Sequence, residues 1–149
     1  MFFCCCKNER DFKPKFNALK NRNYSEFKDV SITIRRGAYI IEYKNQEYIA
    51  QTYLVTNTIS SIKIRNGRVI QKNELEYNVI KRIIKSFKKL DVAGLYVDKN
   101  NNILFLFYSG KCAYFFLKLN KGTSLKDLKR EYYIHYENNW YLNKECGEY

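Results

Sequence analysis

The sequence contains few of the residues from which catalytic and metal centres are built. Its only histidine among 149 residues is His135, which lies in a stretch rich in aromatic residues. A zinc motif or an acid–base centre normally draws on clustered histidine, cysteine and carboxylate side chains. We therefore interpret His135 as a structural residue. We predict no catalytic site, no metal and no cofactor.

Ligand-binding motifs are also missing. No internal repeat is visible, and no run of 18 or more apolar residues is present that would indicate a membrane-spanning helix. Residues 98–102 match the opening of a calcium-binding loop, but Ile103 stands where that loop needs glycine and Ser109 where it needs glutamate. Residues 110–111 and 122–124 lack the glycine pattern of a phosphate-binding loop. We interpret all three segments as turns and predict no small-molecule substrate.

Aromatic surface and positive charge are abundant. The chain has 14 tyrosines and 10 phenylalanines, and 46% of its residues are hydrophobic, which is enough to build the core of one domain of this length. Lysine and arginine number 27 against 15 aspartates and glutamates, giving a net charge of +12. Such a charge draws a protein toward phosphate-bearing surfaces, either nucleic acid or anionic lipid. AT-rich codons encode lysine, asparagine, isoleucine and tyrosine, so genome composition is the alternative explanation of the basicity.

The five cysteines fall into two groups. Three are adjacent, at positions 4–6, and adjacent cysteines are poorly spaced for a structural zinc site. Cys112 and Cys146 are isolated in the sequence. They either form a disulfide in an oxidising compartment or are separate thiols, and the sequence leaves both alternatives open.

The first residues resemble the end of a bacterial lipoprotein signal peptide. Phe2 and Phe3 precede the cysteine run, and polar residues from Lys7 onward follow it. The resemblance implies an acyl anchor on Cys6 and a start codon upstream of Met1, because a complete signal has a longer apolar stretch. S-acylation of the cysteine cluster, or an N-terminus with three inert thiols, are the alternatives.

On this interpretation, residues 1–28 are a stub and tether, and residues 29–149 form a single domain. Within the tether, the apolar residues from Phe12 to Phe27 predict one or two short helical turns, with Pro14 in the first turn of the earlier one.

The first half of the domain predicts an antiparallel meander followed by a helix. Apolar and polar residues alternate between residues 32 and 64, with turns at residues 36–37 and 44–46 and a hairpin at Asn66-Gly67. Asn73, with Glu76 three residues later, predicts the start of the main helix. The apolar stripe of this helix contains Val79, Ile80, Ile83, Ile84, Phe87 and Leu90.

The second half predicts central strands and a closing hairpin. The runs at residues 103–108 and 112–119 are apolar on both faces, which indicates strands covered by the helix on one side and by a second layer or a barrel interior on the other. Ser124 with Asp127 predicts a short helix, and residues 132–142 predict a final hairpin. The predicted fold is α+β, with antiparallel meanders and one main amphipathic helix packed on the sheet, in a two-layer or barrel-like arrangement.

These features favour a small non-enzymatic lipoprotein of the cell envelope that binds another macromolecule. An immunity-type protein that binds a toxin is one such role. The alternative is a cytosolic nucleic-acid-binding module that uses the polar face of the main helix. The candidate residues on that face are Lys81, Arg82, Lys85 and Lys88.

Overall fold

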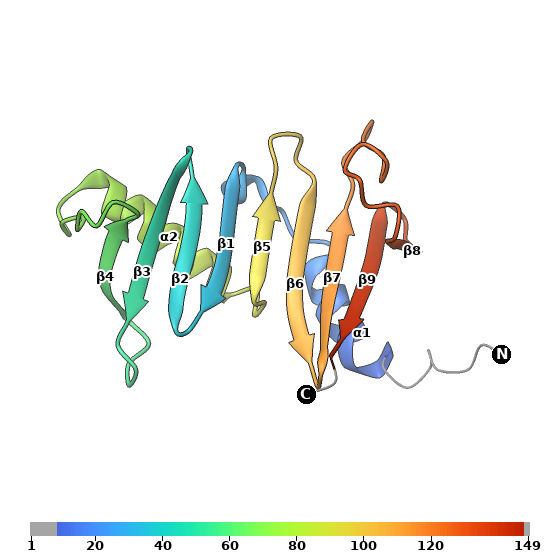
Figure 1. The fold of residues 1–149 in the computed structure, drawn as a ribbon, viewed down its shortest axis with the longest axis horizontal. Helices are drawn as coiled ribbons and strands as arrows, with labels where there is room; N and C mark the ends of the chain where they lie inside the picture. Colours follow the sequence, from blue (N-terminus) through green and yellow to red (C-terminus); the bar gives the residue numbers. More distant parts are fainter. Residues whose placement is uncertain (1–8, 148–149) are drawn as a thin grey trace.

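Nine strands, some with alternating apolar and polar residues and some apolar on both faces, pair into one antiparallel sheet. The computed structural model describes residues 9–147, and over this range the strand order is β4-β3-β2-β1-β5-β6-β7-β9-β8 (Figure 1). The predicted α+β class is confirmed. The barrel-like alternative is wrong, because the sheet is open, with β4 and β8 at its edges. The elements are α1 (Glu9–Leu19), a 3-10 turn (Ser25–Phe27), β1 (Val30–Arg35), β2 (Ala38–Tyr43), β3 (Gln46–Thr52), β4 (Ile59–Ile64), α2 (Leu75–Lys88), β5 (Gly94–Val97), β6 (Ile103–Ser109), β7 (Cys112–Lys118), β8 (Ile134–Glu137) and β9 (Trp140–Cys146).

Two of the predicted turns connect strands of the first meander. The backbone φ angles are 49° and 77° at Arg36-Gly37, and 50° and 60° at Lys44-Asn45. Two consecutive positive φ angles are what a type I′ hairpin turn requires. Both turns are therefore confirmed.

The chain turns back at Asn66-Gly67, as predicted, and the returning segment pairs briefly with β4: Ile64 N–H donates to the backbone oxygen of Arg68 at 3.0 Å, and Ile70 N–H donates to that of Ile62 at 2.9 Å. The type I′ geometry on which the prediction rested is wrong. Gly67 has a positive φ, but Asn66 does not, and the Asn66 side chain instead accepts the backbone N–H of Arg68 at 3.0 Å. After this turn, Val69 forms a single bridge with Lys63 and no strand follows. β4 is consequently an edge strand.

α2 packs its apolar stripe against the sheet, as predicted. Ile80, Ile83, Ile84 and Phe87 are buried, and Val79 is half-buried against the same core. These residues recur every three or four positions, which places them on one side of the helix. The lysines between them face solvent.

The start of α2 differs from the prediction. The helix begins after Glu74, which is the N-cap residue, so capping by Asn73 is wrong. The Glu74 carboxylate accepts the backbone N–H of Gln71 at 2.7 Å and a hydrogen bond from Arg68 at 3.1 Å, and together these lower its pKa. Glu76 also pairs with Arg68, at 3.2 Å, and is thereby drawn away from a capping position.

α1 packs on the same face as α2, toward the β7–β9 end of the sheet (Figure 1). Phe12, Phe16 and Leu19 lie at helical spacing and are buried. The Phe16 ring stacks on Phe116 with centroids 5.0 Å apart and meets Trp140 edge-on at 5.3 Å. α1 therefore contributes aromatic side chains to the core.

The segment after α1 is also part of the core. Tyr24 and Phe27 are buried, and the Tyr24 hydroxyl donates to the backbone oxygen of Leu19 at 2.7 Å. Residues 12–27 thus belong to the folded domain and are not the tether that we predicted. Pro14 lies inside a single 11-residue helix and not in its first turn. The part of the predicted stub from residue 1 to 8, with Cys6, lies outside the described residues.

The opposite face of the sheet has only a partial cover, in place of the predicted second layer. Leu117 and Leu119 pack with Tyr133, and Leu125 and Leu128 lie against them. The predicted short helix is absent, and the segment around Leu125 forms successive turns instead. Within it, the Ser124 hydroxyl donates to the Asp127 carboxylate at 2.7 Å, which is the side-chain pairing that the sequence indicated.

Asn102 is the single buried polar residue among residues 12–147, whose side chains the structure describes. Its side-chain nitrogen donates to the Asp98 carboxylate at 2.9 Å, and its side-chain oxygen accepts the backbone N–H of Asn120 at 2.8 Å. Asp98 Oδ1 also accepts the backbone N–H groups of Asn100 and Asn102. Residues 98–102 are therefore a hydrogen-bonded turn, as predicted, and Asn102 ties this turn to the end of β7.

Asn102→Ala is expected to lower the free energy of unfolding by about 1–3 kcal/mol, because the Asn120 N–H loses its acceptor in a partly buried place. Urea denaturation measures the change. Asn100→Ala is the matched control, since Asn100 is exposed in the same turn, and it is expected to stay within about 0.5 kcal/mol of the parent. Equal effects of the two substitutions would contradict a structural role for Asn102.

Candidate binding surfaces

The sheet face opposite the two helices carries a row of mostly apolar residues, and we call this face the bare face. Side chains alternate between the two faces of a strand, so the neighbours of the buried core residues point toward the bare face. The strand register aligns one such residue from each of six strands. The row runs through Ile49, Ile40, Thr33, Gly94, Leu106 and Phe115. Apart from Gly94, which is buried, all are half-buried.

Gly94 lies at the centre of this row, and the side chains around it leave little room for another. A methyl group added there would lie 3.3 Å from Thr33 Cγ2, from Leu106 Cβ and from Tyr96 Cε2. These distances are tighter than ordinary van der Waals contact, so the neighbouring side chains already fill the space above the glycine. The middle of the bare face is consequently a packed surface and not a cavity.

Arg35, Tyr96 and Tyr108 lie on β1, β5 and β6, beside the middle of the row. Burial raises the pKa of the Tyr96 phenol, the nearby Arg35 guanidinium opposes this rise, and Tyr108 adds to it. Tyr108 is 66% exposed. The bare face therefore presents hydrogen-bonding groups beside its apolar row.

Phe115 lies between two hollows of the bare face. One has a volume of about 370 Å³ and the other about 520 Å³, and the Phe115 side chain lines both. The first is lined by Tyr96, Asp98, Asn102, Leu104, Phe115, Leu117, Leu128 and Arg130. The second is lined by Tyr108, Gly110, Lys111, Cys112, Ala113, Phe115, Glu145, Cys146 and Gly147. Phe115 is thus a projecting ring with a recess on each side.

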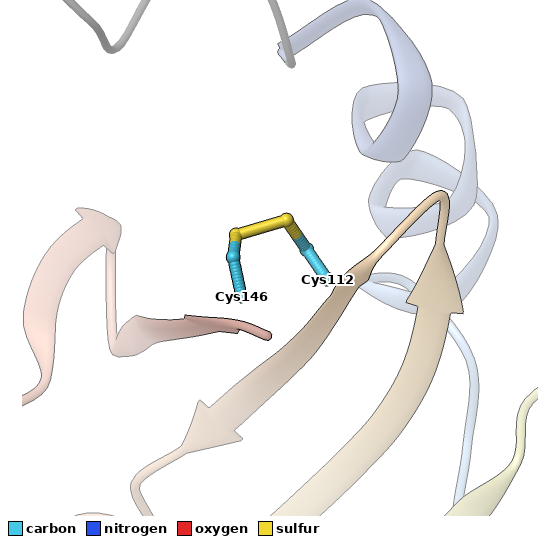
Figure 2. Close-up of a disulfide and its surroundings, with 2 residues drawn as sticks. All are labelled: Cys112 and Cys146. Atoms are coloured by element: carbon cyan, nitrogen blue, oxygen red, sulfur yellow. A yellow bond between two sulfur atoms is a disulfide. The ribbon is translucent and has the colours of Figure 1, made fainter. Parts of the chain in front are cut away.

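Cys112 and Cys146 form a disulfide, which answers the question that the sequence left open (Figure 2). The two residues are direct partners in the register of β7 and β9. The bond closes the end of this strand pair close to α1 (Figure 2). It fixes the C-terminal end of β9 to the start of β7.

Three of the four predicted basic residues lie around one pocket. Lys81, Lys85 and Lys88 line a recess of about 410 Å³, whereas Arg82 is exposed but is not among its lining residues. Lys72, from the loop before α2, is a fourth lysine of this recess, and no periodic pattern in the sequence connects it with the helix. We call this recess the lysine pocket. It also contains Asn57, Thr58, Ile59, Tyr77 and Ile84.

The His135 side chain is held by contacts with residues of the same hairpin. Its Nε2 lies 2.7 Å from the backbone oxygen of Asn138, and its ring meets Tyr141 edge-on at 5.5 Å. Within residues 9–147, no three histidine, cysteine or carboxylate side chains gather in a way that could hold a metal ion. In the same range, neither α-helix combines the length and apolar character needed to cross a membrane.

Comparison with protein-family models, with curated proteins and with solved structures finds no match for this chain. The fold of this chain is α+β, with an open antiparallel sheet that two helices cover on one face. Its two candidate binding surfaces are the bare face and the lysine pocket.

Proposed function

We propose that this chain is a small non-enzymatic protein of the cell envelope, held at a membrane by an acyl chain on Cys6, and that it acts by binding another protein through the bare face. An immunity-type protein that covers a toxin is one such role. The observation that supports this proposal is the apolar row from Ile49 to Phe115, which crosses six strands and has no covering layer over most of its length.

The chemistry of the bare face suits a protein partner. Its apolar centre, with Ile40, Leu106 and Phe115, has charged residues of both signs nearby, such as Arg35 and Glu42. Protein interfaces combine an apolar centre with a polar rim, and exposed apolar patches of this kind mark them. The net charge of +12 favours an acidic partner.

The disulfide supports the proposed location. Disulfides form and persist in oxidising compartments and are rare in the cytosol. A cross-strand bond between Cys112 and Cys146 therefore favours a chain that folds outside the cytosol. This is the environment of an envelope protein.

The partner surface is tested by site-specific photocrosslinking in cells that produce the full chain. A benzophenone amino acid replaces Phe115 or Ile40 on the bare face, and Lys99 in the exposed turn between β5 and β6 serves as control. We expect one discrete adduct with another protein from both bare-face positions and none from Lys99. Equal adducts from all three positions, no adduct from the bare face, or adducts only with a second copy of the chain would contradict the proposal.

The anchor is tested separately. Metabolic labelling with an alkynyl fatty acid, on the gene with its upstream codons, is expected to label the parent chain and to leave Cys6→Ala unlabelled. Retention of the label in Cys6→Ala, or absence of label in the parent, would exclude Cys6 as the acylation site. Neither outcome affects the crosslinking result.

A further inference from the structure

The turn between β3 and β4, residues 53–58, presents apolar side chains almost entirely to solvent, and we call it the tip. Tyr53 is 60% exposed, Leu54 99% and Val55 97%. Tight turns are usually built from glycine, asparagine, aspartate, serine and proline, so two consecutive aliphatic residues within a turn are unusual. A few fully exposed apolar side chains are normal on a protein surface, but here they are adjacent and project together.

The tip is held in its shape by hydrogen bonds. The backbone N–H of Tyr53 donates to the oxygen of Thr58, and that of Asn57 donates to the oxygen of Tyr53, both at 2.9 Å. The side-chain oxygens of Thr56 and Thr58 lie 2.7 Å apart. Leu54 and Val55 are therefore presented by an ordered turn.

The lysine pocket lies directly beside the tip. Lys88 Nζ donates to the backbone oxygen of Asn57 at 2.7 Å, and Asn57, Thr58 and Ile59 form one wall of the pocket. No acidic side chain lines the pocket. With the side chains of residues 12–147, the other three lysines of the pocket, Lys72, Lys81 and Lys85, form no ion pair. Their charges are thus available to an anionic ligand.

Further cations flank the tip on its other side. The Thr52 hydroxyl donates to the backbone oxygen of Gly37 at 3.2 Å, which joins the base of the tip to the turn between β1 and β2. Arg35 and Arg36 are exposed at this turn. The apolar tip is therefore next to both the lysine pocket and an arginine pair.

We propose that the tip and the lysine pocket form a surface that contacts anionic lipid headgroups, with Leu54 and Val55 entering the apolar layer below them. A membrane surface offers both chemistries in adjacent layers: apolar side chains bind at the boundary with the acyl chains, and lysines bind the charged headgroups. A nucleic acid offers phosphates to the lysines but no complement to two exposed aliphatic side chains. The observed combination favours lipid.

The position of the tip in the fold agrees with this inference. The tip, the turn between β1 and β2, and the start of α1 all lie at the lower edge of the sheet in Figure 1. A membrane at that edge meets the tip at one end of the sheet and α1 at the other. The contact is separate from the bare face, so it goes beyond the proposed protein partner, and it requires no acyl chain.

The test uses the full chain as Cys6→Ala, which removes the proposed acylation site. Its partition is measured by cosedimentation with vesicles of phosphatidylglycerol and phosphatidylcholine in equal parts, and with vesicles of phosphatidylcholine alone. We expect binding to the anionic vesicles that weakens with salt, and at least tenfold weaker binding to the neutral ones. Absence of binding to anionic vesicles at low salt would overturn the proposal.

Two variants separate the apolar and cationic contributions. Each lysine near an anionic surface contributes about fivefold to partition, so a chain with Lys72, Lys81 and Lys85 changed to Glu is expected to bind at least about 100-fold more weakly. Leu54→Ser with Val55→Ser is expected to weaken binding at least about tenfold, because the aliphatic side chains no longer transfer out of water. Circular dichroism spectra like that of the parent show that these exposed substitutions leave the fold intact.

The matched control changes Lys99, Lys121 and Lys126 to Glu, which alters the net charge equally at exposed positions away from the tip. We expect its binding to stay within about threefold of the parent. A loss equal to that of the pocket variant would mean nonspecific attraction and would overturn the assigned surface. Binding of a single-stranded DNA oligonucleotide that depends on the pocket lysines and exceeds vesicle binding would overturn the choice of lipid.

Discussion

Phe16→Ala is expected to lower the free energy of unfolding of the full chain by about 3–5 kcal/mol. The Phe16 side chain is 1% exposed. Its ring centroid lies 5.0 Å from that of Phe116, 4.7 Å from Tyr136 and 5.3 Å from Trp140. The substitution leaves a cavity where α1 meets β7, β8 and β9, and it removes aromatic contacts that stabilise beyond area burial. Equilibrium unfolding in urea measures the difference.

Lys13→Ala is the matched control, since Lys13 is exposed on the same helix. Its free energy of unfolding is expected to lie within about 0.5 kcal/mol of the parent. If residues 12–27 were a tether outside the domain, the two substitutions would have the same small effect. A large difference between them places α1 in the core.

Loss of the disulfide is expected to lower the free energy of unfolding by about 3–4 kcal/mol. Cys112 and Cys146 are 34 residues apart, and a crosslink of that span restricts the unfolded chain by an amount of this order. Unfolding of the full chain in urea, with and without dithiothreitol, measures the change. The comparison is made in a background in which the cysteines at positions 4–6 are replaced by serine.

The control for reduction is a chain in which Cys112 and Cys146 are both replaced by alanine. This variant is expected to show the lowered stability without reductant and no further change when reductant is added. Rapid alkylation of both thiols in the folded, unreduced chain would show that the bond is absent. A reductant effect in the double variant would indicate another cause.

Much of the architecture could be predicted because it follows from local patterns. Period-two alternation indicated the first meander, and period-3.6 spacing placed the apolar stripe of α2 on the sheet. The same spacing of Phe12, Phe16 and Leu19 was visible in the sequence. The cysteine run before it indicates a boundary and so favours a tether, although burial of those three side chains is what the spacing implies.

The bare face and the lysine pocket depend on long-range arrangement. Leu104 and Leu106 look like buried residues in the sequence, yet they are half-buried, because only part of the sheet is covered on their side. Lys72 joins the helix lysines because the chain before α2 runs back along β4, where Ile70 N–H donates to the backbone oxygen of Ile62. Hydrophobic periodicity identifies which face of an element is apolar but not whether another element covers it.

The packing of α1 sets the order in which the domain can be completed. α1 is synthesised before the sheet, but its ring contacts are to Tyr114, Phe116, Tyr136 and Trp140, on the last three strands of the described domain. During synthesis, Phe12 and Phe16 have no native partners until β7 and β9 emerge. A partly synthesised chain therefore exposes an amphipathic aromatic helix, which is a site for a chaperone or for aggregation. β9 both fills this core and brings Cys146 to Cys112, so the fold of the described domain closes only after β9 has been synthesised.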